Sequence, residues 1–499
     1  MKRDTLTALG LVLALVAVAA VVASAATLVL GLGSGDPPEV DVAEIASEAA
    51  SPPEEGSDDP FAFSEERERA LVRRASLGLS HVIYAKSPGG VQASAERTDR
   101  WRPQIEEVAE RHGIDPDTLE AMVFLESAGR PEVMADGTPH SATGLTQILP
   151  STARDLLGMR VDEERSAELT KRIARAAEKG RTEKVRELAA ERRRVDERFD
   201  PERALDGAGR YLRMAADRFG SEELAVVSYH MGIGNLESVI AAYTGEEVGD
   251  ERTRDVVAEH DLTYARLFFD SSPRRHAEAW EILSQFGDDS AVYLWRVTAS
   301  RQIMAEWREN PEALSERNRL ATAKATLEEV YHPESETDVY DDPDEIAEAR
   351  EEGELVPIPD DPTLGFRVTR HLGELADELG VDRELYQALR PEALAALTYM
   401  ASQVKAISGV ERPLQLTSAV RDRPYQEALI GVNGEATREY SLHTTGWAFD
   451  IRRDYANDRQ AEAFQFVLDR MRAHALIDYA VEPAAIHVTV SPFARELTE

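Results

Sequence analysis

The sequence contains no cysteine, and this absence excludes several kinds of site. The chain has no disulfide framework, no thiolate metal site and no lipidated cysteine. Any metal ion must therefore be held by histidine, aspartate or glutamate side chains. The 499 residues are still enough for about three domains with linkers.

Positive charge is also scarce. The chain has 57 Lys+Arg residues against 93 Asp+Glu residues, which gives a net charge of -36. Domains that bind nucleic acid usually present a basic surface to the phosphates. We therefore expect no nucleic-acid partner and an acidic, well-solvated surface.

Long apolar runs are confined to the N-terminus, where residues 6–32 contain only Thr7, Ser24 and Thr27 as polar side chains. Such a run is long enough to cross a bilayer core of about 30 Å. Residues 23–25 also form a small-residue cleavage pattern. Because apolar residues continue to position 32, a signal anchor is favoured for residues 1–33, and a cleaved signal peptide remains the alternative.

Lys2 and Arg3 precede the apolar run, which favours a cytoplasmic N-terminus and an exported remainder. The predicted location is the cell envelope, periplasm or cell surface, with residues 6–32 in the cytoplasmic membrane. Two acidic segments rich in proline, 34–60 and 332–363, are predicted to be a solvated tether and an interdomain linker.

The segments between these boundaries differ in their apolar periodicity. Helical patterns dominate the first part, and alternating segments typical of strands appear after Pro413. The predicted fold is multidomain, with a mainly α domain followed by a smaller α+β domain. The predicted units are 61–250 with a charged helical insertion at 161–195, a helical extension at 251–331, and the α+β domain at 364–499.

In the first unit, residues 103–113 and 115–127 are predicted to form two helices, and Asp115 followed by Pro116 starts the second. Glu126 then falls at the end of an apolar helix face. A carboxylate in that position is either an ordinary boundary residue or an acid whose pKa is raised by desolvation.

Four blocks in this unit resemble the soluble lytic transglycosylases, the goose-type-lysozyme-like enzymes that cut peptidoglycan glycan strands. The blocks are Glu126 with Ser127, residues 144–150, residues 199–201 with 209–212, and residues 228–235. The resemblance implies a lysozyme-like fold without a cofactor and a lyase reaction at the MurNAc-GlcNAc bond that gives a 1,6-anhydro sugar. The chain departs from the family at Thr146, at His230 and in the insertion.

By the same resemblance Glu126 acts first as general acid and then as general base, and no second carboxylate is needed. The family pattern also implies sugar-binding roles for a further set of residues. These are Ser127, Gln147, Tyr229, Gly232 and Asn235.

In the α+β unit, the spacing of His443 and Asp450 around a glycine turn suits two ligands of one zinc ion. Strand alternation places Asp450 opposite its apolar neighbours, and the strand predicted at 485–490 turns His487 away from its own apolar neighbours. Three such ligands leave a fourth position open for water, as in catalytic zinc sites. A buried hydrogen-bonded network is the alternative for any one of these residues.

Residues 441–450 match the motif Ser-x-His-x-x-Gly-x-Ala-x-Asp of the D-alanyl-D-alanine carboxypeptidase family of zinc peptidases, which includes the vancomycin-resistance D,D-peptidases. The resemblance implies that Arg421 holds a substrate carbonyl or carboxylate. The third family motif is altered, since Glu482 lies further from His487 than expected. Glu482 is the predicted general base, and the alternatives are Asp478 or a solvent-exposed structural role.

Together these patterns predict a membrane-tethered enzyme with two peptidoglycan-degrading sites. Its partners would be glycan strands, stem peptides, the cytoplasmic membrane and further cell-envelope proteins, and Zn²⁺ would be the cofactor of the α+β unit. Two alternatives remain open: a wall-binding scaffold in which one or both domains are inactive, or an enzyme in which only the glycan site works.

Overall fold

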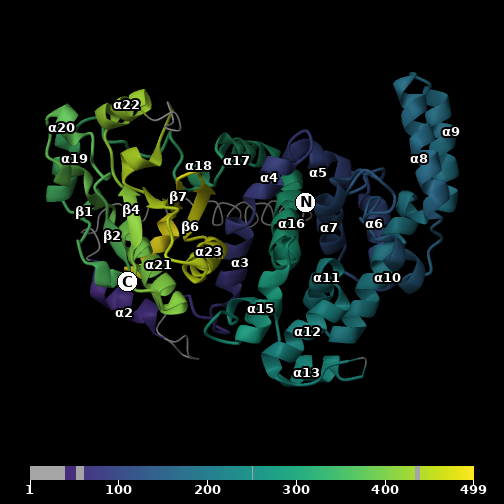
Figure 1. Cartoon of the computed structure of the whole chain (residues 1–499). Helices are drawn as coiled ribbons and strands as arrows, with labels where there is room; N and C mark the ends of the chain where they lie inside the picture. Colours follow the sequence, from purple (N-terminus) through teal and green to yellow (C-terminus); the bar gives the residue numbers. More distant parts are fainter. Residues whose placement is uncertain (1–39, 52–60, 250, 433–438, 499) are drawn as a thin grey trace, which may run out of the picture.

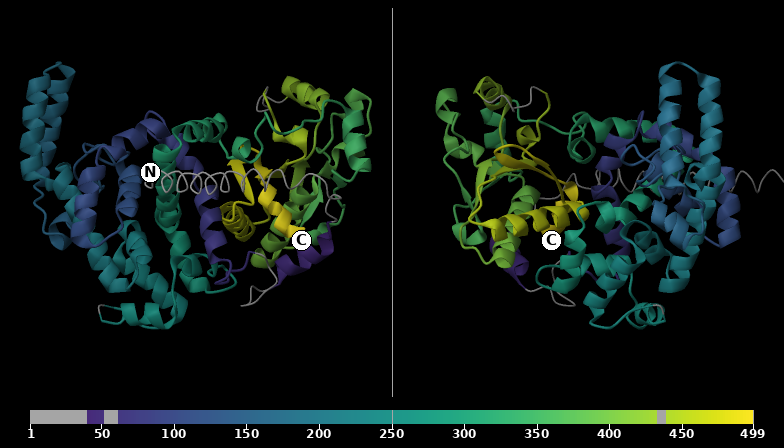
Figure 2. Two further views of the ribbon diagram at one scale, coloured as in Figure 1. Left: turned by 180° about the vertical axis from the view of Figure 1, so that it is seen from behind. Right: turned by 45° about the vertical axis from the view of Figure 1, so that its right-hand side comes forward.

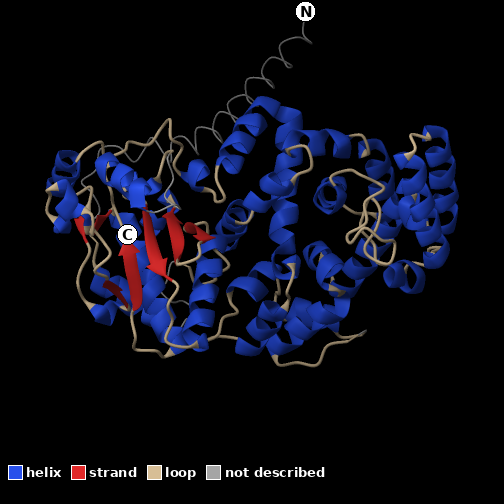
Figure 3. Ribbon diagram, turned by 45° about the horizontal axis from the view of Figure 1, so that its top comes forward, coloured by secondary structure: helices blue, strands red, loops and turns tan. Residues whose placement is uncertain are grey.

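A computed structural model of the chain describes residues 40–51, 61–249, 251–432 and 439–498. Within this described part, a helical head is followed by an α+β head, and the strands lie in the second head alone (Figures 1 and 3). The order agrees with the sequence prediction of a mainly α domain before an α+β domain. No helix in the described ranges is long and apolar enough to cross a membrane, and the predicted anchor at 6–32 lies outside them.

The helical head packs its helices around α7, which is buried on most of its surface. The two helices predicted around Glu126 are present as α6 and α7, and the Asp115 carboxylate accepts a hydrogen bond at the start of α7 as expected. The helices are α3 (Glu68–Gly78), α4 (His81–Lys86), α5 (Val91–Asp99), α6 (Arg102–His112), α7 (Pro116–Ser127), α8 (Glu163–Glu178), α9 (Thr182–Val195), α10 (Pro201–Phe219), α11 (Glu222–Met231), α12 (Ile233–Thr244), α13 (Thr253–Glu259), α14 (Tyr264–Phe269), α15 (Ala277–Gln285), α16 (Tyr293–Glu309) and α17 (Pro311–Ala323).

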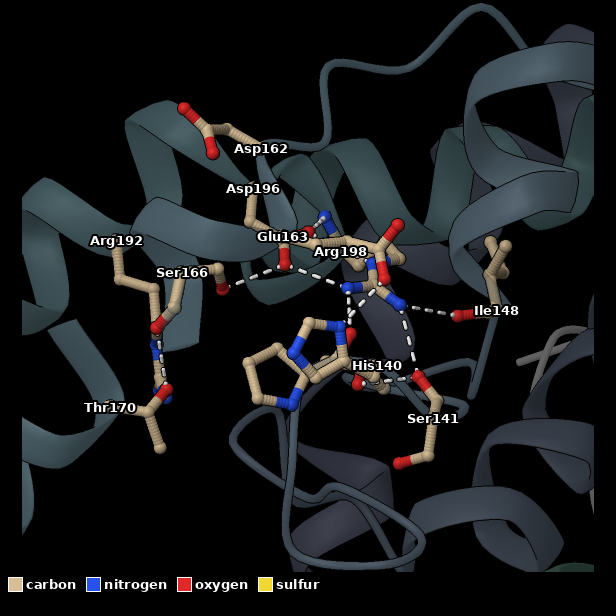
Figure 4. Close-up of polar contacts among 12 residues, drawn as sticks. His140, Ser141, Ile148, Asp162, Glu163, Ser166, Thr170, Arg192, Asp196 and Arg198 are labelled. Carbon is tan, nitrogen blue, oxygen red and sulfur yellow. Dashed lines mark hydrogen bonds and ion pairs between the residues drawn. The ribbon is translucent and has the colours of Figure 1, made fainter. Parts of the chain in front are cut away.

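The predicted charged insertion is the hairpin α8–α9, which projects from the end of the helical head that is distant from the sheet (Figure 1). Its base is fixed by a fully buried ion pair between Arg198 and Asp196. Arg198 also donates hydrogen bonds to the carbonyls of Pro139, Ser141 and Ile148 (Figure 4). The hairpin base therefore holds the loop that carries one of the four sequence blocks.

The α+β head is built on a five-stranded sheet of order β2-β4-β5-β7-β6. Only β2 and β4 are parallel, and the short β1 and β3 form a separate pair. Helices α21 and α23 cover the sheet face that carries Phe449 and Val488. The strands are β1 (Val356–Pro357), β2 (Phe366–Val368), β3 (Ala388–Leu389), β4 (Leu414–Ser418), β5 (Ala448–Arg452), β6 (Ile477–Val481) and β7 (Ala485–Val490), and the helices are α18 (Glu328–Tyr331), α19 (Pro343–Glu351), α20 (Ala376–Leu379), α21 (Pro391–Ser408), α22 (Arg423–Val432) and α23 (Asp458–Ala473).

Sheet register places two of the predicted metal ligands side by side. Strands β5 and β7 are antiparallel neighbours, and Asp450 is paired with His487. Since Phe449 and Val488 point to the covered face, the alternation of side chains turns Asp450 and His487 to the opposite face. This local geometry is what the alternating sequence patterns predicted.

The two segments predicted to be solvated are partly packed. Within the expected tether, α2 (Val42–Ala50) buries Ile45 and Ala49 against α21. Within the expected linker, α19 buries Ile346 in a small apolar cluster, and Tyr340 is also buried. The acidic composition of the two segments did not indicate this packing, because each helix buries only one narrow apolar stripe.

The two heads contact each other directly through α3 and α23 (Figure 2). Ala473 of α23 belongs to the apolar core of the helical head. The Arg470 guanidinium donates hydrogen bonds to the carbonyls of Phe268 and Ser271 in that head. Residues on both sides thus form one continuous packed region.

Candidate active sites

Glu126 lies in the last turn of α7, next to a cavity on the surface of the helical head. The helix ends immediately afterwards because Ala128 adopts a left-handed conformation. The Glu126 carboxylate is partly exposed and accepts a hydrogen bond of 2.6 Å from the Tyr293 hydroxyl. Desolvation raises the pKa of Glu126 to about 7, although the hydrogen bond from Tyr293 opposes that rise. The carboxyl group is therefore still protonated well above the pH at which an ordinary glutamate ionises.

Tyr293 was not predicted from the sequence. It starts α16, in the extension where no chemistry was recognised, and its ring stacks on His230 with a centroid distance of 4.9 Å. Sequence reasoning missed Tyr293 because this residue lies outside the four sequence blocks. It reaches Glu126 only through the packing of α16 on α7.

Two of the predicted sugar-binding residues donate hydrogen bonds to backbone carbonyls of the 144–150 block. Ser127 is 2% exposed, and its hydroxyl donates to the carbonyl of Leu145 at 2.8 Å. The Tyr229 hydroxyl donates to the carbonyl of Thr146 at 2.7 Å. The sugar contact of Ser127 stays a prediction: its hydroxyl ties α7 to the 144–150 block, and the residue also lines the cavity beside Glu126.

The remaining predicted residues hold turns around the site. Gln147 has a φ of 50° and donates through Nε2 to the carbonyls of Val133 and Gly144. Gly232, with a φ of 88°, makes the turn between α11 and α12, and Asn235 donates to the carbonyl of Met231 at 2.8 Å. None of these three residues lines the cavity beside Glu126, and no hydrogen bond described in the structure joins them to its carboxylate.

The cavity beside Glu126 is lined by α4, the end of α7 and the start of α16. Its walls combine apolar side chains with the cationic Lys86, Arg130 and Arg296. Among the described residues that line it, the only other carboxylate is Asp289, which forms an ion pair with Arg296. Glu126 is thus the one carboxylate of this described lining without a cationic partner, and three cationic side chains lie in the same wall, although the chain as a whole is strongly acidic.

The second site brings His443, Asp450 and His487 together. His443 lies on a short 3-10 helix (Leu442–Thr445), and the other two lie on β5 and β7. One potential ligand atom from each residue lies within 4.8 Å of the others. The Oδ1 atom of Asp450 is 3.2 Å from Nε2 of His443 and 2.9 Å from Nδ1 of His487.

The ionisation states of the three residues differ in how well they suit a metal ion. Burial would lower the pKa of His487, but its contacts with Asp450 and Glu328 raise that pKa to about 10, so this ring must release a proton when it binds a metal. Burial, followed by the nearby Arg421 charge, lowers the pKa of His443, so its imidazole is neutral and has a free lone pair. Burial alone would raise the pKa of Asp450, but His443 and His487 hold it well below its usual range. Two nitrogens and one carboxylate are a donor set that zinc accepts, and the residues present therefore fit the ion implied by the sequence.

Arg421 lies beside this cluster and is 9% exposed. Its guanidinium donates to Ser418 Oγ at 2.5 Å and to Gln426 Oε1 at 3.0 Å, and it lies 3.4 Å from Asp450 Oδ2. These contacts fix the orientation of the guanidinium, which lines the same cavity as the three ligands.

The two candidate bases have different surroundings. Glu482 is partly exposed and lines the cavity with the ligands. Asp478 is buried, and it accepts hydrogen bonds from Arg472 at 2.6 Å and from the amide of Leu327 at 2.7 Å. Asp478 is therefore a structural residue here. The structure also places Glu328, which sequence reasoning missed, on the cavity wall.

Comparison with known proteins covers the first site. Residues 103–248 match the family model described as the transglycosylase SLT domain. Two proteins named endo-type membrane-bound lytic murein transglycosylase A, from two strains of Klebsiella pneumoniae, are each 31% identical over 70 residues, which is 14% of this chain and 33% of the relative. The chain thus spans about a third of the length of these relatives. Residues 103–248 carry a transglycosylase SLT domain, and the resemblance predicted for the helical head is confirmed.

Proposed function

We propose that the protein degrades peptidoglycan at two sites, cutting the glycan strand in the helical head and the stem peptide in the α+β head. The observation that carries the first activity is Glu126, whose pKa is raised to about 7 inside a cavity of the SLT domain. The matched relatives are named lytic murein transglycosylases, which supports the same substrate class.

At the glycan site, Glu126 would donate its proton to the glycosidic oxygen as the bond between the two sugars breaks. The 6-hydroxyl of the muramoyl sugar then attacks the anomeric carbon of the same sugar and returns a proton to Glu126, while the protonated GlcNAc oxygen leaves. The product is a 1,6-anhydro sugar, and water is not consumed. Asp289 is paired with Arg296, which agrees with a mechanism that uses a single carboxylate.

At the second site, His443, Asp450 and His487 would hold a zinc ion. When bound, zinc would act as a Lewis acid that polarises a carbonyl and lowers the pKa of water. Arg421 would bind a carbonyl or carboxylate of the stem peptide through its oriented guanidinium. Glu482 would accept a proton from the water that attacks the peptide carbonyl and pass it to the leaving amine as the C–N bond breaks.

We further propose that the protein acts in the cell envelope and that residues 6–32 tether it to the cytoplasmic membrane. A tether would keep both sites near one insoluble substrate and raise their local concentration there. The word membrane-bound in the names of the matched relatives supports this location.

Mass spectrometry of the products from purified peptidoglycan tests both activities. The parent protein with zinc should release anhydro-muropeptides and shortened or uncross-linked peptides. The variant Glu126→Gln should lose only the first products, and His443→Ala only the second.

Two other results would replace the proposal. Anhydro products with unchanged stem peptides, from the parent and from His443→Ala alike, would leave the glycan site as the only activity. Unaltered peptidoglycan, together with wall binding that persists in both variants, would indicate a scaffold.

A further inference from the structure

A carboxylate from outside the predicted domain 364–499 faces the predicted metal ligands. Glu328 is the first residue of α18, in the segment that leads from the helical head to the α+β head. Its side chain is buried, with 8% exposure, and its Oε2 atom lies 3.6 Å from Nε2 of His487. Burial of an acid at this point calls for a partner, and His487 is close enough to be one.

In each of the two histidines, one ring nitrogen faces Asp450 and the other ring nitrogen faces a second oxygen acceptor. In His487, Nδ1 faces Asp450 and Nε2 faces Glu328. In His443, Nε2 faces Asp450 and Nδ1 lies 2.9 Å from the carbonyl oxygen of Ala419. A metal-binding histidine usually donates its second N–H to a carboxylate or a carbonyl, which fixes the ring and makes the ligand nitrogen more basic.

Helix α18 is fixed to the same strands that carry the site. Before it, the amide of Leu327 donates to Asp478 on β6 at 2.7 Å. After it, the ring of His332 makes a 2.7 Å hydrogen bond to the carbonyl of Val490 on β7. Because both ends are held, Glu328 has a defined position relative to His487.

The Glu328 carboxylate is itself oriented by its neighbours. Lys324 Nζ lies 3.8 Å from Oε1, and the Thr326 hydroxyl donates to Oε2 at 3.3 Å. The lysine charge faces one oxygen, and the second oxygen is directed to the histidine ring.

We infer that Glu328 is a positioning residue of the metal site: its carboxylate accepts the Nε2 proton of His487 and holds Nδ1 of that ring toward the metal position. The inference rests on the proposed metal site. A movement of a few tenths of an ångström would turn the 3.6 Å ion pair into a hydrogen bond. It also means that the site uses a residue outside the predicted domain 364–499, so the segment before residue 364 would take part in peptide cleavage.

Titration of the full-length protein with Co²⁺ and Zn²⁺ tests this inference without any assay of activity. Glu328→Gln keeps the size of the side chain but removes the negative charge, and it should weaken binding of both ions by about 10- to 100-fold. The visible absorption bands of bound Co²⁺ should change as well, because the His487 ring is less firmly oriented. Glu328→Asp should recover part of the affinity.

Glu329→Gln is the matched control, because Glu329 is the next residue, is buried to a similar degree and bonds to the amide of Glu334 instead. This control should bind both ions like the parent. Thermal unfolding of each apo variant would show whether a loss of affinity comes from a loss of folding.

The outcomes separate two failures. If the parent binds neither ion, the metal site and this inference both fall. If the parent binds the ions and Glu328→Gln binds them equally well with an unchanged Co²⁺ spectrum, only the role of Glu328 is rejected. Equal weakening in Glu328→Gln and Glu329→Gln would assign the effect to packing of α18 and would also reject it.

Discussion

The Tyr293 hydroxyl sets how far the pKa of Glu126 rises. Desolvation raises that pKa, and the hydrogen bond from Tyr293 lowers it by stabilising the carboxylate. Tyr293→Phe removes only the donor, so the pKa of Glu126 should move above 7. Because the general acid must be protonated, the alkaline limb of the kcat/KM profile for glycan cleavage should shift upward by about one pH unit.

Tyr211→Phe is the control for this experiment, since the Tyr211 hydroxyl donates to the carbonyl of Ser228 and not to Glu126. Its alkaline limb should coincide with that of the parent. A profile for Tyr293→Phe that keeps the limb in place, or moves it to lower pH, would show that this hydrogen bond does not control the acid.

Glu482 and Asp478 should respond differently to removal of their charge. Glu482→Gln should reduce peptide cleavage by about 10²- to 10⁴-fold, as expected for loss of a general base, with zinc affinity and melting temperature unchanged. Asp478→Asn should instead destabilise the fold by about 1–3 kcal/mol, because the half-buried Arg472 would lose its charged partner.

Zinc titration, thermal unfolding and peptide-release kinetics on the same two variants would distinguish these roles. If Asp478→Asn loses turnover at full stability while Glu482→Gln remains active, the assignments of the two residues must be exchanged.

At the scale of elements, the 144–150 block depends on close backbone packing at Gly144. This residue has a φ of 86°, and an added Cβ would lie 1.9 Å from the carbonyl oxygen of Arg198. Gly144→Ala should therefore displace the loop from the hairpin base and lower stability by several kcal/mol, well beyond the cost of about 1–2 kcal/mol for the left-handed conformation alone. Denaturant unfolding and glycan cleavage would measure both effects.

Gly137→Ala provides the comparison, because Gly137 has a φ of 79° but open space around its Cα. It should show only the conformational cost and keep its activity. Equal losses in the two variants would mean that the contact with Arg198 is unimportant.

The elements also show what sequence patterns can and cannot predict. Helices α6 and α7, the hairpin α8–α9 and the sheet face on which Asp450 and His487 lie follow from caps, periodicity and strand alternation, which act within a few residues. Tyr293 and Glu328 could not be found in that way. Each reaches its site through tertiary packing of a helix that carries no motif, so nothing in its local sequence separates it from an ordinary core residue.

The acidic composition misled the prediction for a related reason. Segments 34–60 and 332–363 carry few apolar residues, yet α2 and α19 each bury a short stripe against the α+β head. Composition averages over a segment, whereas docking needs only a few apolar positions at helical spacing.

At the scale of the whole molecule, the two heads are coupled through a backbone contact between α3 and the end of α23. An added Cβ at Gly78 would lie 1.9 Å from the carbonyl oxygen of Arg472, and Ala473 is buried in the core of the helical head. With such a shared core, the parent protein should unfold in a single cooperative transition in calorimetry.

Gly78→Ala should separate the heads, because the new methyl group has no room against rigid backbone. We expect two resolved transitions, or a lower melting temperature for one head, with both active sites still folded at low temperature. Gly431→Ala is the helical control with open space around its Cα, and it should be neutral or stabilising by about 0.5–1 kcal/mol. If Gly78→Ala keeps one transition at the parent temperature, the heads do not depend on this contact.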